Sequence, residues 1–216
     1  MRQFSPADIL ALIEGLKWTL LLVALTLAFG GPLALLVSLA RSARAKAPRW
    51  IAWAYIEMLQ GIPLLGLLMF FYFGLPVFLN IELPALIAVA LAYALYTGAF
   101  LGEIWRGGIA AVRQAQWEAA DCLGLSRRHV FIHVIAPQAL RIALPATVGF
   151  LVQLIKNTSL ASVVGFVELA RAGQIVIAGT FQPLLTYSLV AVVYFALCYP
   201  LTRWSRSLEA RFNGAG

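Results

Sequence analysis

Long runs of uncharged, mostly apolar residues alternate with short charged segments along this chain. A bilayer core is crossed by about 20 apolar residues of α-helix, at about 1.5 Å of rise per residue. The runs that reach this length are Trp18–Ala40, Met58–Ile81, Leu83–Gly102 and Pro183–Thr202. A shorter run, Ile142–Ile155, is followed after Lys156 by a further apolar stretch. The pattern predicts five membrane spans, with an interrupted region between the fourth and the fifth.

The composition points to the same class of protein. Hydrophobic residues make up 62% of the 216 residues, charged residues only 12%, and the mean hydropathy is +0.88. The charged share is about half of that in soluble globular domains. We therefore expect an all-α integral membrane protein that forms a single transmembrane domain over residues 1–216. The first apolar run is too long for a cleavable signal peptide, so we expect it to remain as a span.

The distribution of basic residues predicts the orientation. The net charge is +7, but the basic residues lie between the apolar runs and not in one block, which argues against a nucleic-acid partner. Twelve of the 16 lysines and arginines follow the first run, the third run or the last run. With five spans these three segments share one side, and an excess of Lys and Arg marks the cytoplasmic side. The amino terminus is thereby predicted outside.

The segment before the first span carries a helix-start signal. Ser5 can cap a helix, Pro6 suits its first position, and Asp8 favours its first turn. The apolar residues between Ile9 and Leu16 then form one face of a helix. The pattern predicts a short interfacial helix that leads into the first span.

One polar segment, EAADCLGLSRRHVFIHVIAPQ (118–138), lies between the third and fourth spans. Residues 118–122 can form a short helix, which Gly124 can end by taking a positive φ. Ser126 can cap a second helix from residue 127, and Pro137 should stop or restart it. The pattern predicts two short cytoplasmic helices that form a docking element. A solvated loop is the alternative, although the segment has more apolar residues than such a loop needs.

The same segment resembles the EAA signature of ABC-importer permeases. The matching residues are Glu118-Ala119-Ala120, Gly124 and Pro137. Other stretches are similar to the polar amino-acid branch of that family, which includes histidine and glutamine permeases. These stretches are GLKWTLLL (15–22), YFGLP (72–76), EIWRGGIAAVRQAQWEAA (103–120), PQALRIALPA (137–146) and KNTSLASVVGFVEL (156–169). In LQGIP (59–63) the chain departs from the family, which commonly has Arg in place of Gln60 and Thr in place of Ile62.

The resemblance implies a permease subunit of an ATP-driven amino-acid importer in the bacterial inner membrane. The implied partners are ABC ATPase subunits, a second permease subunit that is identical or homologous, an extracytoplasmic amino-acid-binding protein and the surrounding membrane lipid. The implied coupling loop spans about residues 107–141, and its ATPase-coupling residues are Glu118, Ala119, Ala120, Gly124, Arg127 and Pro137. No GxxxxGK[ST] motif occurs in the sequence. We therefore expect ATP and Mg²⁺ on the ATPase, and no cofactor, metal or catalytic residue in this chain.

Two other classes of function are alternatives to an importer permease. A membrane-embedded enzyme could use His129 and His133 as zinc ligands, but the sequence HVFIH lacks the glutamate of HExxH. A zinc analysis would discriminate. A secondary transporter driven by an ion gradient is the other alternative. Five spans are few for it and no inverted repeat is visible, and ATP dependence in vesicles would discriminate.

The interrupted fourth span predicts the substrate path. Asn157 or Ser159 can cap a second helix there, and the free N–H groups of a helix start attract the carboxylate of an amino acid. The predicted path residues are Gln153, Lys156, Asn157, Thr158 and Ser159, together with Glu57 and Gln60 of the second span. The alternative is that Lys156 extends to the outer interface and Asn157 only caps a helix. Small residues of the third span predict a closely packed face, a candidate contact for the second permease: Ala88, Ala90, Ala92, Ala94, Gly98 and Gly102.

Overall fold

The computed structural model describes residues 2–213, which form helices and short connections without any strand. The first half contains α1 (Pro6–Ser42), α2 (Lys46–Gly61), α3 (Leu64–Met69), the π-helical η1 (Phe70–Gly74), α4 (Leu75–Leu79) and α5 (Ala85–Ala110). The second half contains α6 (Gln114–Cys122), α7 (Arg127–Val130), the π-helical η2 (Phe131–Ile135), α8 (Ala136–Asn157), the 3₁₀-helical η3 (Thr158–Val164), α9 (Leu169–Thr180) and α10 (Pro183–Asn213).

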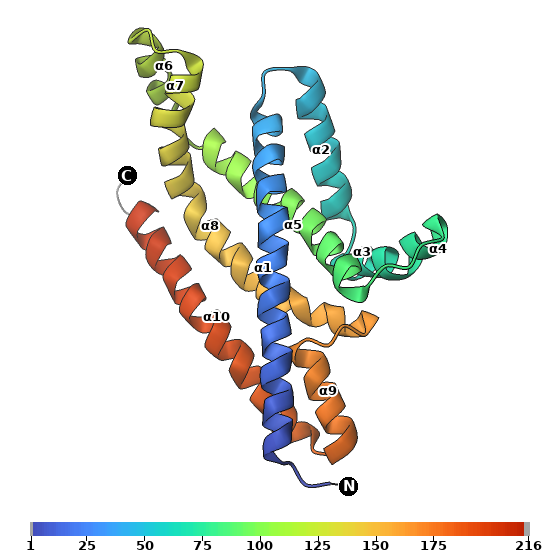
Figure 1. Ribbon diagram of the computed structural model, residues 1–216. Helices are drawn as coiled ribbons and strands as arrows, with labels where there is room; N and C mark the ends of the chain where they lie inside the picture. Colours follow the sequence, from blue (N-terminus) through green and yellow to red (C-terminus); the bar gives the residue numbers. More distant parts are fainter. Residues whose placement is uncertain (1, 214–216) are drawn as a thin grey trace.

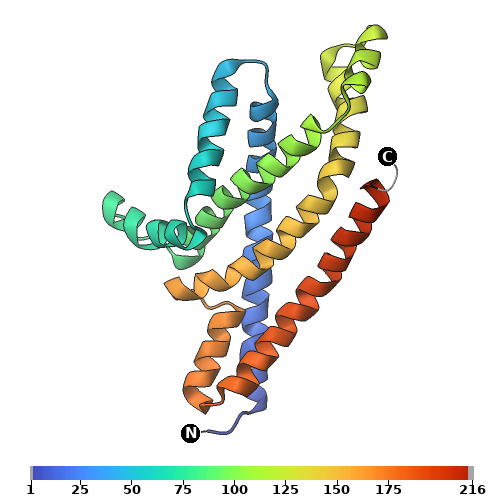
Figure 2. The same cartoon turned by 180° about the vertical axis from the view of Figure 1, so that it is seen from behind.

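The long helix α1 runs the length of the molecule, and α2, α5, α8 and α9 pack against it (Figures 1 and 2). α5 and α8 cross it at an angle, with α2 on one side and α10 on the other. α6 and α7 project at one end, while the amino terminus and α9 lie at the opposite end. Within residues 2–213, four helical stretches are long and apolar enough to cross a membrane, and the number is five if the bent pair α2 with α3–α4 forms one span. The predicted all-α membrane architecture is confirmed.

The second span differs from its prediction. The uncharged run 58–81 is not one helix, because the chain bends by 98° between residues 61 and 64. Ile62 has φ −102° and ψ 128°, an extended conformation typical of a residue before proline, here Pro63. α2 instead begins at Lys46, well before the uncharged run, and α3, η1 and α4 form a separate arm that projects sideways (Figure 1).

The predicted interfacial helix is also wrong, because α1 is continuous from Pro6 to Ser42. Its start is as predicted: the Asp8 carboxylate accepts hydrogen bonds from the Ser5 backbone N–H (2.9 Å) and hydroxyl (3.1 Å), and it pairs with Arg2. No break follows, since α9 packs on these first turns. A Cβ on Gly15 would lie only 2.7 Å from the Cβ of Ala172 in α9.

The face of α5 that carries the small residues packs against α1 of the same chain. The prediction that this face contacts a second subunit is therefore wrong. Ala88, Ala92 and Ala94 are buried. A Cβ placed on Gly30 of α1 would lie 2.8 Å from the Cβ of Thr97 and 3.0 Å from the carbonyl oxygen of Ala94. In a bilayer the lipid is as apolar as the side chains, so this close backbone approach supplies the packing energy that joins the two helices.

Gly30→Ala should therefore destabilise the protein, because the added methyl group must push α1 away from α5. We expect a loss of about 1–3 kcal/mol, the usual cost of overpacking. Thermal unfolding of the detergent-solubilised protein measures it. Gly31→Ala is the matched control, since a Cβ there meets nothing within 4 Å. Equal unfolding temperatures for the two variants would contradict the close-packing argument.

Candidate functional site

The segment from α6 to η2 forms a compact projection, which we call the knob (residues 114–135), at one end of the molecule (Figure 1). Gly124 joins its helices with φ +69°, a conformation that costs a residue with a side chain free energy. The Ser126 hydroxyl accepts a hydrogen bond from the backbone N–H of His129 at 3.4 Å. The predicted pair of short helices with a glycine turn is therefore present.

A small hydrophobic core of its own stabilises the knob. Ala120 is 4% exposed, Val130 1% and Ile135 0%, and they pack with Val112 and Ala139. This burial accounts for the apolar surplus of the segment and distinguishes the knob from a solvated loop. The third residue of the EAA motif is thus structural, whereas Glu118 and Ala119 are exposed, as are Leu123 and Arg127.

Pro137, predicted to stop or restart the second knob helix, does not stop it and lies instead in the first turn of α8. The helical stretch continues without a break from Arg127 to Val164. The π-helical turn η2 directly precedes the proline, and there the Ala136 N–H bonds to the carbonyl of Phe131. A wider turn accommodates a residue that has no N–H to donate and whose ring crowds the preceding turn. The knob is consequently mounted on the end of α8.

The helix break lies later than predicted. Asn157 and Ser159 cap no second helix, because η3 continues α8 as far as Val164 and the chain turns only at Gly165, which has φ +84°. The hydroxyls of Thr158 and Ser159 donate to carbonyls of their own helix, each at 2.7 Å. The Asn157 side-chain oxygen accepts from the Gln153 amide at 3.0 Å. These four polar groups therefore stabilise the helix end locally.

Glu168, which the sequence analysis overlooked, caps the helix after the break. It has no exposed surface, and its carboxyl oxygens accept from the backbone N–H groups of Ala170 (2.9 Å) and Arg171 (2.8 Å) and from the hydroxyl of Tyr194 (2.8 Å). The backbone N–H of Leu169, the residue directly after Glu168, donates to the Thr19 hydroxyl at 3.1 Å. A substrate carboxylate is not needed at this helix start, since Glu168 already occupies it. The sequence did contain a signal for this cap: an acidic residue, Glu168, directly before a run with apolar residues at helical spacing.

Two of the predicted path residues line a groove between α8 and α10. Gln153 and Lys156 border a cavity of about 320 Å³ together with Thr202, Arg206 and Glu209, among others. Lys156 also borders a second cavity of about 290 Å³ with residues 194–202 of α10. Lys156 thus lies on the side of α8 that faces the last span.

The structure does not bring the other two predicted path residues to this groove. Glu57 and Gln60 are exposed on α2, which lies across α1 from α10 (Figure 1). Within residues 2–213 no three His, Cys, Asp or Glu side chains lie close enough to hold a metal ion. The imidazole rings of His129 and His133 stack with their centroids 4.0 Å apart, and the Nδ1 of His133 lies 3.2 Å from the carbonyl oxygen of His129.

Comparison with known proteins places these features in context. Residues 30–214 match the family described as "Binding-protein-dependent transport system inner membrane component". The glutamine transport system permease protein GlnP of Escherichia coli (strain K12) is 38% identical over 94% of this chain and 93% of its own length. The probable amino-acid ABC transporter permease protein YckA of Bacillus subtilis (strain 168) is 36% identical, over 93% and 88% respectively.

Solved structures show the same fold. The structure titled "Crystal structure of an amino acid ABC transporter with histidines" superimposes with a TM-score of 0.86 and is 30% identical, covering 97% of this chain and 100% of its own. The MetNI methionine ABC transporter in an inward-facing conformation gives a TM-score of 0.75 at 18% identity, over 96% and 99%, which bears on the fold alone.

Glu168→Ala should destabilise the membrane domain more than a surface change does, because it leaves two backbone N–H groups and the Tyr194 hydroxyl without their acceptor. The expected loss is about 1–3 kcal/mol for each buried group left unpaired. Tyr194→Phe should cost less, since it removes one donor and leaves the cap of α9 intact. Limited proteolysis and thermal unfolding measure both effects. Glu82→Ala, at an exposed carboxylate, is the control, and a Glu168→Ala protein as stable as this control would refute the capping role.

Proposed function

The chain belongs to the family of binding-protein-dependent transport system inner membrane components, and on that premise we propose how its residues contribute to transport. It is the transmembrane permease subunit of an ATP-driven ABC importer for amino acids, a multi-pass protein of the bacterial inner membrane. Such a permease works with an ATPase and a substrate-binding protein. The match over residues 30–214 carries this conclusion, and it favours the importer over a secondary transporter or a membrane enzyme.

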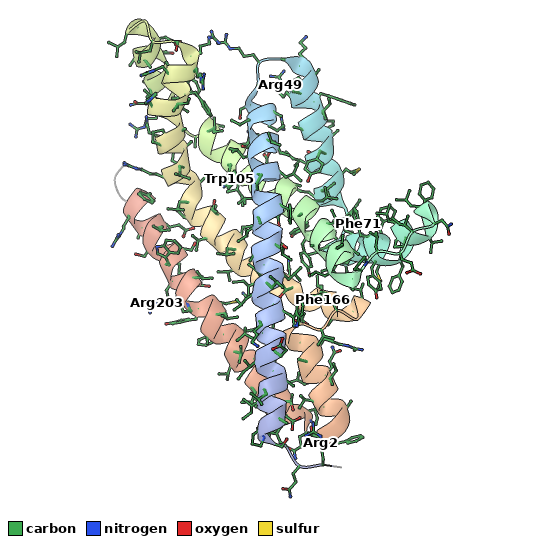
Figure 3. The ribbon with its side chains drawn as sticks, in the orientation of Figure 1. Arg2, Arg49, Phe71, Trp105, Phe166 and Arg203 are labelled. Atoms are coloured by element: carbon green, nitrogen blue, oxygen red, sulfur yellow. The ribbon has the colours of Figure 1, made fainter. Side chains whose placement is uncertain are left out.

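The knob faces the cytoplasm in this proposal. It lies at the same end of the molecule as the turn between α1 and α2, whereas Arg2 lies at the other end (Figures 1 and 3). The basic segments 41–49 and 106–141 both lie at the knob end of the molecule. This placement agrees with the enrichment of Lys and Arg on the cytoplasmic side.

The knob is the proposed contact with the ATPase. Its exposed residues Glu118, Ala119, Leu123 and Arg127 form a surface of mixed polarity on a rigid support. Because the helix runs unbroken from Arg127 to Val164, displacement of the knob moves α8 as a lever. ATP and Mg²⁺ bind to the ATPase in this mechanism, and a second permease subunit, identical or homologous, supplies the other wall of the path.

The groove between α8 and α10 is the proposed wall of the substrate path in this subunit. An amino acid carries a carboxylate and an ammonium group at neutral pH. The groove has charges of both signs, because Lys156 is positive and Glu209 is negative. Lys156 is the proposed contact for the carboxylate, since it is exposed and none of the salt bridges within residues 2–213 engages it. Lys156 also lies on the helical stretch that the knob moves, which would link the groove to the ATPase.

Gly124→Val should uncouple the transporter, because valine is strained at φ +69° and the knob helices would shift relative to each other. We expect substrate-stimulated ATP hydrolysis to fall by about tenfold, corresponding to about 1.4 kcal/mol of lost interaction. Co-purification of the ATPase and its stimulated turnover measure the change. Gly124→Asn is the matched control, since asparagine tolerates this backbone conformation, and it should retain most activity. Wild-type turnover in the valine variant would remove the knob from coupling.

Lys156→Gln should lower uptake by about tenfold or more while basal ATP hydrolysis persists, because a charge-assisted hydrogen bond to the substrate is lost. The assay is uptake into reconstituted vesicles, beginning with glutamine, the substrate named for the relative GlnP. Lys17→Gln is the control, as Lys17 is an exposed lysine that pairs with Glu14 at 2.6 Å. Equal uptake by the two variants at limiting substrate would show that the substrate passes elsewhere.

A further inference from the structure

The turn between α1 and α2 concentrates positive charge without compensating acid. Arg41, Arg44, Lys46 and Arg49 lie within nine consecutive residues, and no Asp or Glu occurs among residues 41–49. The salt bridges within residues 2–213 involve Arg2, Lys17 and Arg106, so none of them neutralises the turn. Four like charges held together in this way repel one another, and an anion would relieve the repulsion.

These charges border a cavity. Arg41, Lys46 and Arg49 line a hollow of about 270 Å³ together with Trp50 and Trp53. The Nε–H of Arg41 is shielded from solvent and has no hydrogen-bond partner within residues 2–213. A buried donor without an acceptor costs free energy, and an anion in the hollow could supply the acceptor. Figure 3 shows Arg49 at this end of the molecule, on the first turn of α2.

The first turn of α2 adds further donors. Its N-cap residue is Ala45, which has no side-chain acceptor, so the backbone N–H groups of Lys46 and Ala47 lack a side-chain cap. Unbonded N–H groups at a helix start favour anions, and phosphate oxygens are suited to them. The cavity therefore has three cationic side chains and lies beside the start of a helix, a combination suited to a phosphate group.

The surroundings of the cavity are those of a lipid and not of a soluble anion. Beyond it, α2 exposes a strip of apolar surface that includes Trp50 (65% exposed), Ile51 (64%) and Met58 (58%). The rings of Trp50 and Trp53 lie 6.4 Å apart, and tryptophan is enriched at the boundary between headgroups and acyl chains. A phospholipid would place its phosphate in the cavity and its acyl chains along this strip.

We propose that the cavity formed by Arg41, Lys46, Arg49, Trp50 and Trp53 binds the headgroup of an anionic phospholipid from the cytoplasmic leaflet. The proposal rests on the orientation given above, which places this turn at the cytoplasmic interface. The bound lipid would hold the α1–α2 turn at the membrane surface. The helix that follows the turn, α2, is joined to the core of the domain, since its Tyr55 hydroxyl donates to the carbonyl of Leu95 in α5 at 2.6 Å.

Native mass spectrometry of the assembled transporter, permease with ATPase, tests the proposal. The complex is equilibrated with equal amounts of phosphatidylglycerol and phosphatidylcholine, and the retained lipids are counted. We expect the wild type to retain the anionic lipid about tenfold more than the zwitterionic one, because each Lys or Arg near the surface attracts anionic lipid measurably. The combined substitutions Arg41→Gln, Lys46→Gln and Arg49→Gln should reduce this preference to about twofold or less.

The matched control removes the same number of positive charges from α10, by Arg203→Gln, Arg206→Gln and Arg211→Gln. This control should keep the wild-type preference. An equal loss in both triple variants would show a general effect of surface charge and overturn the site. If the triple variant of the turn does not assemble, Arg49→Gln alone, at an exposed position, should reduce the preference by at least twofold, and no reduction would overturn the proposal.

Two further results would assign the cavity to another ligand. Displacement of the lipid by excess inorganic phosphate would indicate a soluble anion, and loss of the ATPase from the turn variant with an unchanged lipid preference would indicate a protein contact. Either result overturns the proposal. The assay reads lipid retention and not transport, so failure of the proposed transport function would appear separately, as absent uptake by the wild type.

Discussion

A chain within a bilayer must satisfy its backbone polar groups internally, and this constraint is most demanding where α8 and η3 give way to α9. The connection contains Gly165 in a left-handed conformation, followed by non-helical residues. Glu168 meets the requirement by accepting from two backbone N–H groups and from Tyr194, while Thr19 accepts the next N–H. The Glu168 carboxyl group thereby joins α9 to α10, and the Thr19 hydroxyl joins α9 to α1. Irregular backbone survives in a membrane only where protein surrounds it.

The fixed break divides the second half of the domain into parts with different roles. Everything from Arg127 to Val164 is one helical stretch, with the knob at one end and the break at the other. The stretch is tied to α5 by Trp105, which donates to the Thr147 hydroxyl at 3.1 Å, and by the Tyr93 hydroxyl, which donates to the carbonyl of Asn157. A displacement at the knob would therefore act on α5 and on the groove beside α10 together.

Close packing of α1 on α5 decides which surfaces remain for other molecules. Small residues bring these two helices together around Gly30, so the face that might have received a partner is consumed within the chain. What stays exposed is different in kind: the knob, the arm from α3 to α4 with Val77 and Phe78, the basic turn before α2 and the groove near Lys156. The contacts proposed for ATPase, lipid and substrate all use elements that the core of the domain leaves free.

The sequence by itself determined the class of the protein, its family, the start of α1 and the glycine turn of the knob. The class follows from composition over long windows, and the family follows from the resemblance carried by residues 118–137 and the similar stretches beside them. The start of α1 and the glycine turn follow from local backbone chemistry at Ser5, Asp8 and Gly124. The bend before Pro63 has a local cause in the sequence, but the tertiary structure decided its angle and where the other helices continue or break. An apolar run indicates only that its surroundings are apolar. The hydropathy of residues 58–81 is therefore the same for a straight span and for the observed pair of helices bent by 98°. Pro137 and Asn157 each permitted either an end or a continuation, because a π-helical or 3₁₀ turn differs little in local energy from the alternative. Partners distant in sequence settled the outcome, as Thr19 and Tyr194 did at Glu168.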